Sequence, residues 1–193
     1  PKKLTLIEID TKLAEDLLIK YSKFNYVKVV KANILDLDLK ENYQLVISNL
    51  PYNISSQIIV KLALLKKSPE KLILMFQKEF AQRLLDKKIN SLNSLIRCFY
   101  DVKLSFNVSK NCFRPIPKVD SSVLVFSKKA KKILREDEVN DFIVFKRNLF
   151  SHKRKSLKNL LRKYHLEKDF NLNLRVENLE LETLISIFRA VNS

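Results

Sequence analysis

The chain has 193 residues, which is enough for one large domain or for a domain with a small appendage. Hydrophobic residues make up 46% of it, so a sizeable core can form and wholesale disorder is excluded. Lysine and arginine number 37 against 21 acidic residues, and the formal net charge of +16 indicates a polyanionic partner such as nucleic acid.

The first half of the chain predicts β-strands that alternate with α-helices. Short β-prone runs are separated by segments whose apolar residues recur at helical spacing. Because the strands are almost continuously apolar, the pattern is typical of a parallel sheet covered by helices on both faces. We expect strands at residues 5–9, 27–32, 44–48 and 71–76, and helices at residues 11–21, 55–66 and 79–85.

Two further strands and then a helical segment follow. The strands, at residues 102–108 and 122–127, are joined by the proline-containing loop CFRPIPKVD and can form an antiparallel edge. After the basic linker that begins at Lys128, apolar stripes at helical spacing continue to the end of the sequence. We therefore predict two domains, an α/β domain over residues 1–127 and a small all-helical domain over residues 128–193.

The stretch Ser48-Asn49-Leu50-Pro51-Tyr52 comes at the C-terminal end of the third predicted strand. Ligands of open α/β sheets bind at that edge of the sheet. The Asn49 side-chain oxygen and the Leu50 carbonyl can accept hydrogen bonds from an exocyclic NH2 group, and Tyr52 can stack on the ring that carries it. A proline turn with a buried tyrosine explains the same residues without any chemistry, and periodicity does not decide between the two.

Four segments, in order along nearly the whole chain, resemble the motifs of one enzyme family. VISNLPYNISS resembles motif IV of the amino-methyltransferases, in the N-L-P-Y form of rRNA adenine-N6 dimethyltransferases of the KsgA type. MFQKEFAQRLL (75–85) is similar to the Q-K-E motif of that family, and FRPIPKVDSSV (113–123) to its F-x-P-x-P-K-V-x-S loop. NLFSHKRKSLKNLL (148–161) resembles the basic helix of its C-terminal domain. This resemblance favours a substrate-binding loop over a plain turn.

The resemblance implies a Rossmann-like methyltransferase that uses S-adenosyl-L-methionine and carries a small helical C-terminal domain. Glu8 matches the acid that binds the ribose hydroxyls of the cofactor, whereas Asp10 fits the simpler role of a helix cap. Asn33 stands where the family usually has an aspartate that binds the adenine amino group, so a charge-assisted bond is lost. Asp36 is the alternative acceptor, although we prefer Asn33. Asn49 is also expected to contact the cofactor.

The resemblance also indicates where the target adenine binds. Asn49, Leu50, Pro51 and Tyr52 would hold its amine, and Phe113 would face Tyr52 so that the flipped base lies between two rings. Hydrogen bonds from N6 to Asn49 and Leu50 favour a more tetrahedral nitrogen as attack develops. The alternative for Phe113 is an ordinary core residue.

Glycine is absent, although a globular chain of this length should carry about 14 glycines at ~7% usage. The abundance of lysine, leucine, isoleucine and asparagine explains part of the deficit. Family members carry a further strand and a glycine-rich loop before the position of Thr5, and a glycine-bearing loop between the positions of Arg83 and Ser94. We therefore expect the methionine and ribose parts of the cofactor site to be incomplete in this sequence.

Basic residues of the second domain form the predicted RNA-binding surface. The run from His152 to Lys155 would normally be a solvated helix face. In a chain of net charge +16 that matches the basic helix of the family, phosphate contact is favoured instead. Lys118, in the loop after Phe113, is expected to touch the phosphate backbone. The predicted RNA-binding residues are Lys118, Arg147, Lys153, Arg154, Lys155, Lys158 and Arg162.

The sequence indicates neither a membrane partner nor a metal. No apolar run approaches the ~18 residues of a membrane span, and the segment that begins at Pro1 lacks an apolar signal region. Cys98 and Cys112 are too few for a disulfide framework, which favours a reducing, cytoplasmic setting. His152 and His165 show no metal-ligand spacing with the cysteines.

The implied activity is dimethylation of the N6 amines of two adjacent adenines in the 3′-terminal hairpin of small-subunit (16S) rRNA. The implied enzyme is a monomer that meets its substrate on a pre-ribosomal particle. One alternative is an Erm-type 23S rRNA adenine-N6 methyltransferase of macrolide resistance, which shares the proline-containing loop but typically has N-I-P-Y or N-I-P-F. The other is a non-catalytic RNA-binding assembly or transcription factor of the same fold. The intact motif from Asn49 to Tyr52 argues against lost catalysis.

Overall fold

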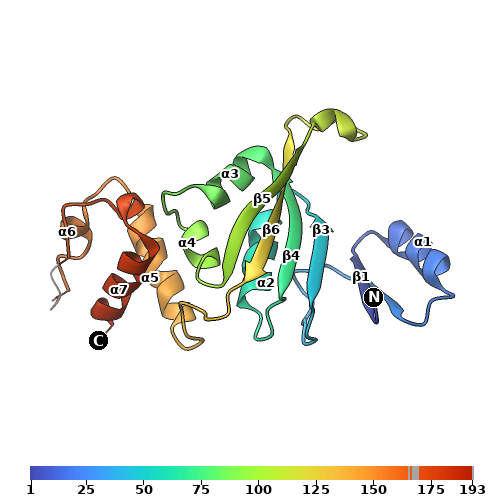
Figure 1. Cartoon of the computed structure of the whole chain (residues 1–193), viewed down its shortest axis with the longest axis horizontal. Coiled ribbons are helices and arrows are strands. Elements are labelled where there is room, and N and C mark those ends of the chain that lie inside the picture. The colour runs from blue at the N-terminus through green and yellow to red at the C-terminus, as the bar shows by residue number, and fades with distance from the viewer. Residues whose placement is uncertain (165, 167–169, 193) are drawn as a thin grey trace.

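The computed structural model describes residues 1–164, 166 and 170–192. His165, which the sequence rejected as a metal ligand, lies outside the described residues. Three parts follow one another along the longest axis of the molecule: a two-stranded unit, a four-stranded sheet and a group of helices (Figure 1). This order confirms the predicted change from an α/β part to a helical part.

The two-stranded unit consists of parallel strands β1 (Leu4–Glu8) and β2 (Val27–Lys31), connected by helix α1 (Thr11–Tyr21). Asp10 caps α1, because its Oδ1 accepts a hydrogen bond from the Leu13 backbone N–H at 2.9 Å. The capping role predicted for Asp10 is therefore confirmed. The backbone N–H of the residue after β2 binds the carbonyl of Glu8 at 2.9 Å, which extends the pairing to the end of β1.

The four-stranded sheet forms the middle of the molecule (Figure 1). Strands β3 and β4 run parallel, whereas β6 is antiparallel to both of its neighbours, which confirms the predicted antiparallel edge. In spatial order the strands are β3 (Leu45–Asn49), β4 (Lys71–Gln77), β6 (Ser121–Lys128) and β5 (Tyr100–Val108). The expectation of one continuous sheet is wrong for the described residues, because β1 and β2 pair only with each other and no described strand joins β1 to β3.

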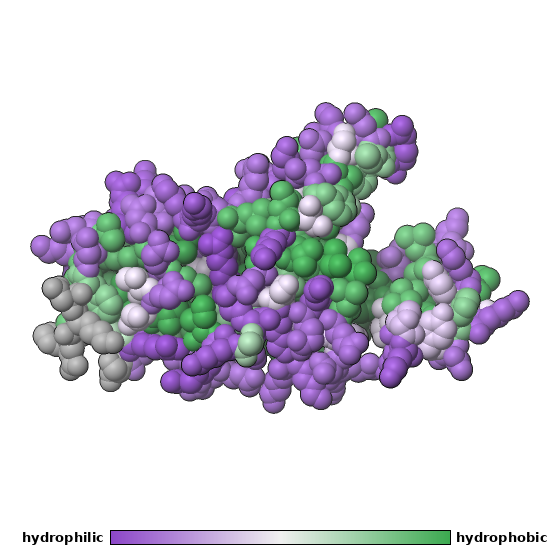
Figure 2. All heavy atoms as spheres, in the orientation of Figure 1, coloured by the Kyte–Doolittle hydropathy of each residue, from purple (hydrophilic) through white to green (hydrophobic). Residues whose placement is uncertain are grey.

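Helices cover one face of the four-stranded sheet. Helices α2 (Ser55–Leu64), α3 (Lys78–Leu85) and α4 (Asn93–Ile96) share one apolar core with the alternate, fully buried positions of β4. On the opposite face of the sheet Ile47 is 68% exposed, and apolar side chains reach the surface there and on the two-stranded unit (Figure 2). In the described part of the chain the predicted cover of helices on both faces is therefore wrong. The buried β4 positions are Leu72, Leu74 and Phe76.

The C-terminal part contains α5 (Val139–Ser151), the short helix α6 (Leu157–Leu160), a 3₁₀ turn η2 (Val176–Asn178) and α7 (Leu181–Val191). The expected basic helix over 148–161 is wrong, because α5 ends at Ser151 and residues 152–156 form a turn. The backbone N–H groups of the first two residues of α6 donate to carbonyls of the 172–174 segment at 2.9 and 2.7 Å. These bonds direct the chain away from the axis of α5.

Two buried charged residues hold the helical part in place, Lys146 by a contact with the α/β part and Glu138 by a contact within the helical part. Lys146 on α5 donates from Nζ to the Ser91 carbonyl at 2.6 Å and contacts the Ser91 hydroxyl at 3.2 Å. Arg189 on α7 holds the buried Glu138 carboxylate with bonds of 2.8 and 3.0 Å. Buried apolar residues form one cluster that runs from α2 to α7. The helical part therefore packs on the sheet as a continuation of its core, and the boundary at residue 128 stays a prediction.

In the described ranges, none of the helices is both long enough and apolar enough to cross a membrane.

Candidate active site

The candidate catalytic loop follows β3 directly. Asn49 is the last residue of β3 and is exposed, whereas the Leu50 side chain is buried and anchors the loop in the core. A turn after Pro51 is closed by a bond from the Ile54 backbone N–H to the Pro51 carbonyl at 3.2 Å. Among the described residues, neither the Asn49 amide nor the Leu50 carbonyl has a hydrogen-bond partner. Both acceptors are thus free to bind a ligand amine.

Tyr52 is held in place by a residue of β6, which is separated from β3 by one strand. Its hydroxyl lies 2.6 Å from the hydroxyl of Ser121, the first residue of β6. The Ser55 hydroxyl donates to the Tyr52 carbonyl at 3.1 Å at the start of α2. The sequence predicted no role for Ser121, although this residue belongs to the quoted loop motif FRPIPKVDSSV. Its full burial beside a strand end explains why spacing alone did not reveal it.

Phe113 lies on the loop that joins β5 to β6, next to a cis peptide bond between Arg114 and Pro115. Its ring is half-buried, so it is not a fully enclosed core residue. The ring contacts of the described residues do not include a Tyr52–Phe113 pair. The predicted sandwich of a base between these two rings therefore stays a prediction.

Glu8 ends β1, at the same end of its strand as Asn49 in β3. Its Oε1 accepts hydrogen bonds from the backbone N–H groups of Ile9 and Asp10 at 2.8 and 2.9 Å. These bonds fix the orientation of the carboxylate and leave Oε2 without a partner among the described residues. The geometry thus offers one strongly accepting oxygen for a hydroxyl-bearing ligand.

Asn33 and Asp36, which the sequence left as alternatives, are hydrogen-bonded to each other. The Asn33 Nδ2 donates to Asp36 Oδ2 at 3.0 Å, and the Asn33 Oδ1 accepts from the Leu35 backbone N–H at 3.0 Å. One lone pair of the Asn33 oxygen is therefore used inside the turn. The exposed Asp36 carboxylate keeps its second oxygen open, so the two residues together present the acceptor that an aspartate would supply alone.

A lysine-lined cleft of about 340 Å³ includes Asp120, the residue before Ser121. Lys78 starts α3, Lys110 starts the short helix η1 (Lys110–Cys112), and Lys118 comes from the proline-containing loop. Asp120 positions the walls, because its Oδ1 accepts from the Lys110 backbone N–H at 3.0 Å and its carbonyl from the Lys78 backbone N–H at 2.9 Å. In the described part of the chain, these lysine ammonium groups have no hydrogen-bond or ion-pair partner.

Of the cleft lysines, only Lys118 was predicted from the sequence. Lys78 and Lys110 lie 40 and 8 residues before it by their numbers in the sequence, and a chain with 37 basic residues gives no local reason to select them. Lys78 is part of the Q-K-E motif, which is the one signal that pointed to its position. The fold brings the three lysines together next to the residue that holds Tyr52.

The basic residues predicted to bind RNA in the helical part are exposed. They belong to the end of α5, the turn 152–156 and α6 with the residues that follow it. Ion pairs of the described residues include none of them, so their charge faces the solvent. They are Arg147, Lys153, Arg154, Lys155, Lys158 and Arg162.

The described residues offer two free acceptors and an aromatic ring after β3, and carboxylates at the end of β1 and after β2 in the separate two-stranded unit. Such a set can hold a planar amine and a hydroxyl-bearing molecule, and the unpaired lysines of the cleft can hold an anion. Among the described residues, no cluster of histidine, cysteine and acidic side chains could hold a metal ion.

Comparison with known protein families gives one match that spans the chain. Residues 1–192 match the family described as ribosomal RNA adenine dimethylase. A ribosomal RNA small subunit methyltransferase A from Mycoplasma capricolum is 35% identical over 212 residues, with 98% of this chain and 79% of the relative covered. The protein of the same name from Flavobacterium johnsoniae is 33% identical over 205 residues, with 100% and 78% covered.

Two solved structures share the fold over almost the whole chain. A dimethyladenosine transferase from Plasmodium falciparum matches with a TM-score of 0.83 and 24% identity, over 96% of this chain and 80% of that one. The 23S rRNA methyltransferase ErmE matches with a TM-score of 0.76 and 22% identity, over 99% and 82%. The predicted Rossmann-like methyltransferase fold with a helical C-terminal part is therefore confirmed.

Proposed function

The chain belongs to the ribosomal RNA adenine dimethylase family, and from this premise we propose that it dimethylates the N6 amines of two adjacent adenines in the 3′-terminal hairpin of small-subunit rRNA. We propose further that it acts as a monomer on a pre-ribosomal particle in the cytoplasm. The relatives at 33–35% identity carry the name ribosomal RNA small subunit methyltransferase A, which supports the choice of the small subunit.

The loop from Asn49 to Tyr52 is the observation that carries the proposal. The exposed Asn49 amide and the Leu50 carbonyl are two acceptors without a partner in the described part of the chain. Tyr52 is fixed by Ser121 at 2.6 Å, so its ring stays beside these acceptors. An adenine presents an exocyclic amine with two N–H donors on a flat ring, and this loop is complementary to both features.

The same acceptors favour the transition state. The N6 lone pair of adenine is delocalised into the ring, which makes the amine a weak nucleophile. Acceptors at Asn49 and Leu50 hold the two N–H groups in an arrangement that suits a more tetrahedral nitrogen, so they stabilise the attacking amine more than the resting one. No strong general base is required of the chain, because the ammonium product is acidic. Positioning therefore supplies much of the rate.

The residues at the ends of β1 and β2 fit S-adenosyl-L-methionine. The free carboxylate oxygen of Glu8 suits its ribose hydroxyls, and the Asn33–Asp36 pair suits its adenine amino group. Asn49 would contact the cofactor from the other side of the site. When bound, S-adenosyl-L-methionine supplies the methyl group that the amine takes up. The residues of this chain orient the amine and keep both acceptors in place.

The lysine cleft and the basic residues of the helical part support an RNA substrate. Lys78, Lys110 and Lys118 line a cleft next to Ser121, the residue that holds Tyr52, and can contact the sugar-phosphate backbone of a flipped nucleotide. The exposed cations around the turn 152–156 lie in the helical part and offer a second set of phosphate contacts. This division supports catalysis in the α/β part and docking in the helical part.

A methyl-transfer assay tests the proposed function against its alternatives. The protein is supplied with S-adenosyl-L-methionine and either pre-30S particles or 23S rRNA. Dimethyladenosine in the small-subunit hairpin supports the proposal. Transfer to 23S rRNA alone would make the chain an Erm-type enzyme, and binding without transfer to either RNA would make it an assembly factor.

A further inference from the structure

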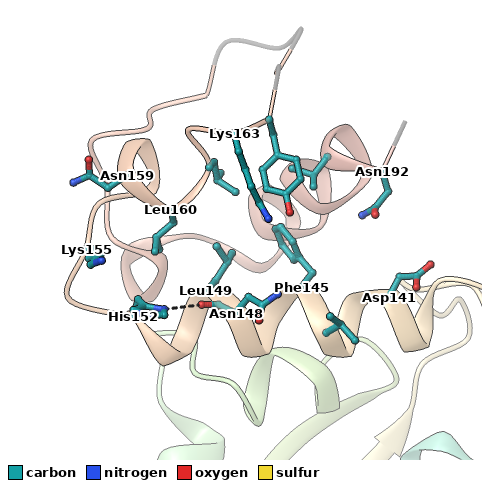
Figure 3. Close-up of a pocket in the computed structure, with 14 residues that line it drawn as sticks. Asp141, Phe145, Asn148, Leu149, His152, Lys155, Asn159, Leu160, Lys163 and Asn192 are labelled. Atoms are coloured by element: carbon teal, nitrogen blue, oxygen red, sulfur yellow. Dashed lines mark hydrogen bonds between the residues drawn. The ribbon is translucent and has the colours of Figure 1, made fainter.

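A second cavity lies in the helical part of the molecule, away from the candidate active site. It has a volume of about 530 Å³, is open to solvent on one side, and is lined by α5, the turn 152–156, α6 and the end of α7. This volume is within the ~300–1,000 Å³ that is usual for small-molecule sites. Figure 3 shows the side chains that converge on it.

The floor of the cavity is apolar. Phe145 and Leu149 on α5 and Leu160 on α6 point into it from two helices (Figure 3). Phe145 and Leu149 are buried in the core, so the floor is rigid, whereas Leu160 is half-buried and offers open apolar surface. A flat, apolar ring can lie on such a floor and remove this surface from water.

The rim of the cavity is polar and carries positive charge. Lys155 and Asn159 lie together beside Leu160, and Lys163 extends over the floor toward Phe145 (Figure 3). The one acidic residue of the lining, Asp141, lies at the opposite end from Lys155. The cavity therefore has one cationic end, at Lys155, and an apolar middle over which Lys163 extends.

Several of these polar groups have no partner inside the protein. The Asn148 and Asn159 side-chain amides form no hydrogen bond with the described residues, and Lys155 and Lys163 form no ion pair with them. His152, in contrast, already has partners within the protein, because its Nδ1 lies 2.9 Å from the Ser151 hydroxyl and 3.4 Å from the Asn148 carbonyl. The free amides and the Lys155 ammonium are thus available to a ligand, whereas the Lys163 ammonium lies over the Tyr164 ring at 5.0 Å from its centroid.

We propose that this cavity binds one unpaired nucleotide of the RNA substrate, outside the target adenines. The inference rests on the proposed function, because it takes RNA as the partner. A nucleotide matches the three parts of the cavity: its base covers the apolar floor beneath Lys163, the edge of the base meets Asn148 and Asn159, and its phosphate meets Lys155. Unpaired bases are the part of RNA that proteins read through stacking and amide contacts.

The apolar floor and the two free amides, of Asn148 and Asn159, distinguish this site from a simple phosphate site. A phosphate alone needs only cations and would leave Leu160 exposed and both amides unused. The lysine cleft next to Ser121 lacks such a floor, since its lining is charged or polar apart from Val119. The second cavity is therefore the one that can select a base.

Titration of the full-length protein tests the proposal. The backbone and asparagine side-chain NMR signals are followed while each of the four nucleoside 5′-monophosphates, or inorganic phosphate at equal ionic strength, is added. We expect at least one nucleotide to shift the signals of Asn148, Asn159 and Leu160, and inorganic phosphate to leave Leu160 unchanged. Identical shifts with phosphate alone, or no shift with any nucleotide, would overturn the proposal.

A variant test connects the cavity with RNA. Asn148→Ala and Asn159→Ala together should weaken binding of the small-subunit 3′-terminal hairpin by about fivefold for each hydrogen bond lost. Asn173→Ala, at an exposed asparagine outside the cavity, should leave it unchanged. Equal binding by the double variant and the wild type would refute the assignment. Methyl transfer by the wild type is measured on pre-30S particles: its absence would contradict the proposed function, while nucleotide shifts at Asn148 would still support the cavity.

Discussion

The hydroxyl of Tyr52 and the hydroxyl of Ser121 lie 2.6 Å apart, although 69 positions separate them in the sequence. The bond joins the loop after β3 to the first residue of β6, which follows the proline-containing loop of Phe113. Two segments that the sequence singled out independently are thus fixed to each other. Because Ser121 is the first residue of β6, its bond ties the Tyr52 side chain to the sheet.

The first prediction concerns this bond. Tyr52→Ala removes the stacking ring and should weaken base binding by about 1–3 kcal/mol. Tyr52→Phe keeps the ring and removes only the hydroxyl, so we expect it to weaken base binding less. Fluorescence of 2-aminopurine at the target adenine measures this. Equal signals for wild type and Tyr52→Ala would show that the ring does not contact the base.

The contribution of Ser121 is separated by a double-mutant cycle. Tyr52→Phe, Ser121→Ala and the double variant are compared by chemical denaturation. We expect a coupling of about 0.5–1.5 kcal/mol for the hydrogen bond. Additive effects of the two substitutions would mean that the two hydroxyls contribute independently.

The second prediction concerns the amine acceptor. Asn49→Ala should lower the rate of methyl transfer by roughly two orders of magnitude, as for the loss of one polar contact to a transition state. RNA binding should be almost unchanged, because the Asn49 side chain adds one small contact to those made by the many basic residues. Asn53→Ala is the matched control, since Asn53 is an exposed asparagine of the same loop. Activity of Asn49→Ala within twofold of wild type would exclude the assigned role.

The sequence predicted the strand–helix order of the first half well, because apolar alternation and helical spacing are local signals. It also placed Asn49 at the end of a strand and Asp10 at a helix start, as the structure confirms. The split between β1 and β3 was missed, since strand pairing is not local. The break after Ser151 was missed for a similar reason: the N–H groups that interrupt the helix bond to a segment about 15 residues downstream.

The site was predicted less completely than the fold. Motifs gave Glu8, Asn49 and Tyr52, which lie at or just after strand ends. Ser121 and the cleft lysines depend on long-range packing, and only the Q-K-E motif distinguishes Lys78 from other lysines. Asn33 in place of the usual aspartate predicted the loss of a negative charge at this position. In the structure, however, its Nδ2 donates to Asp36 Oδ2 at 3.0 Å. The neighbouring turn thus supplies a carboxylate that the aligned position lacks.

The third prediction concerns the basic turn. Changing Lys153, Arg154 and Lys155 together to glutamine should weaken particle binding and flatten its dependence on salt. Each lost phosphate contact should reduce the slope of the logarithm of the binding constant against the logarithm of the salt concentration by about 0.7–0.9. Binding of S-adenosyl-L-methionine, measured by calorimetry, should be unchanged because these side chains lie in the helical part.

The matched control for the basic turn is a triple change of exposed lysines elsewhere. Lys66, Lys67 and Lys71 lie at or before the start of β4, at the end of the strand opposite the catalytic loop. Replacing them with glutamine removes the same charge from the chain. A salt slope that falls equally in both variants would show a general effect of charge and not a docking surface.

The fourth prediction concerns Lys146. Burial, with a smaller effect of Arg147, lowers the pKa of Lys146 from 10.5 to about 8. The unfolded chain then holds this proton more tightly than the folded protein between about pH 8 and pH 10.5, so stability should rise across that window. Chemical denaturation at several pH values should show this rise in wild type and a smaller one in Lys146→Met. Parallel profiles for the two proteins would contradict the shift.

The last prediction concerns Glu138, which holds α7 to the segment before α5. Its carboxylate accepts bonds from the Arg189 side chain at 2.8 and 3.0 Å and from the Arg135 backbone N–H at 2.8 Å. The Arg189 hydrogen bond is the main cause that lowers the pKa of Glu138 from 4.5 to about 2. Its stabilising effect is therefore fully present above about pH 4.5 and is lost as the pH falls toward 2.

Thermal unfolding between pH 2 and pH 6 tests this. Wild type should lose stability as the pH falls through that window, and Glu138→Gln should start lower and change less, because it has no proton to take up. Glu15→Gln, at an exposed glutamate of α1 outside the ion pairs of the described residues, should follow wild type. A Glu138→Gln profile parallel to that of wild type would mean that other carboxylates, and not the link between Glu138 and Arg189, set the acid sensitivity of the helical part.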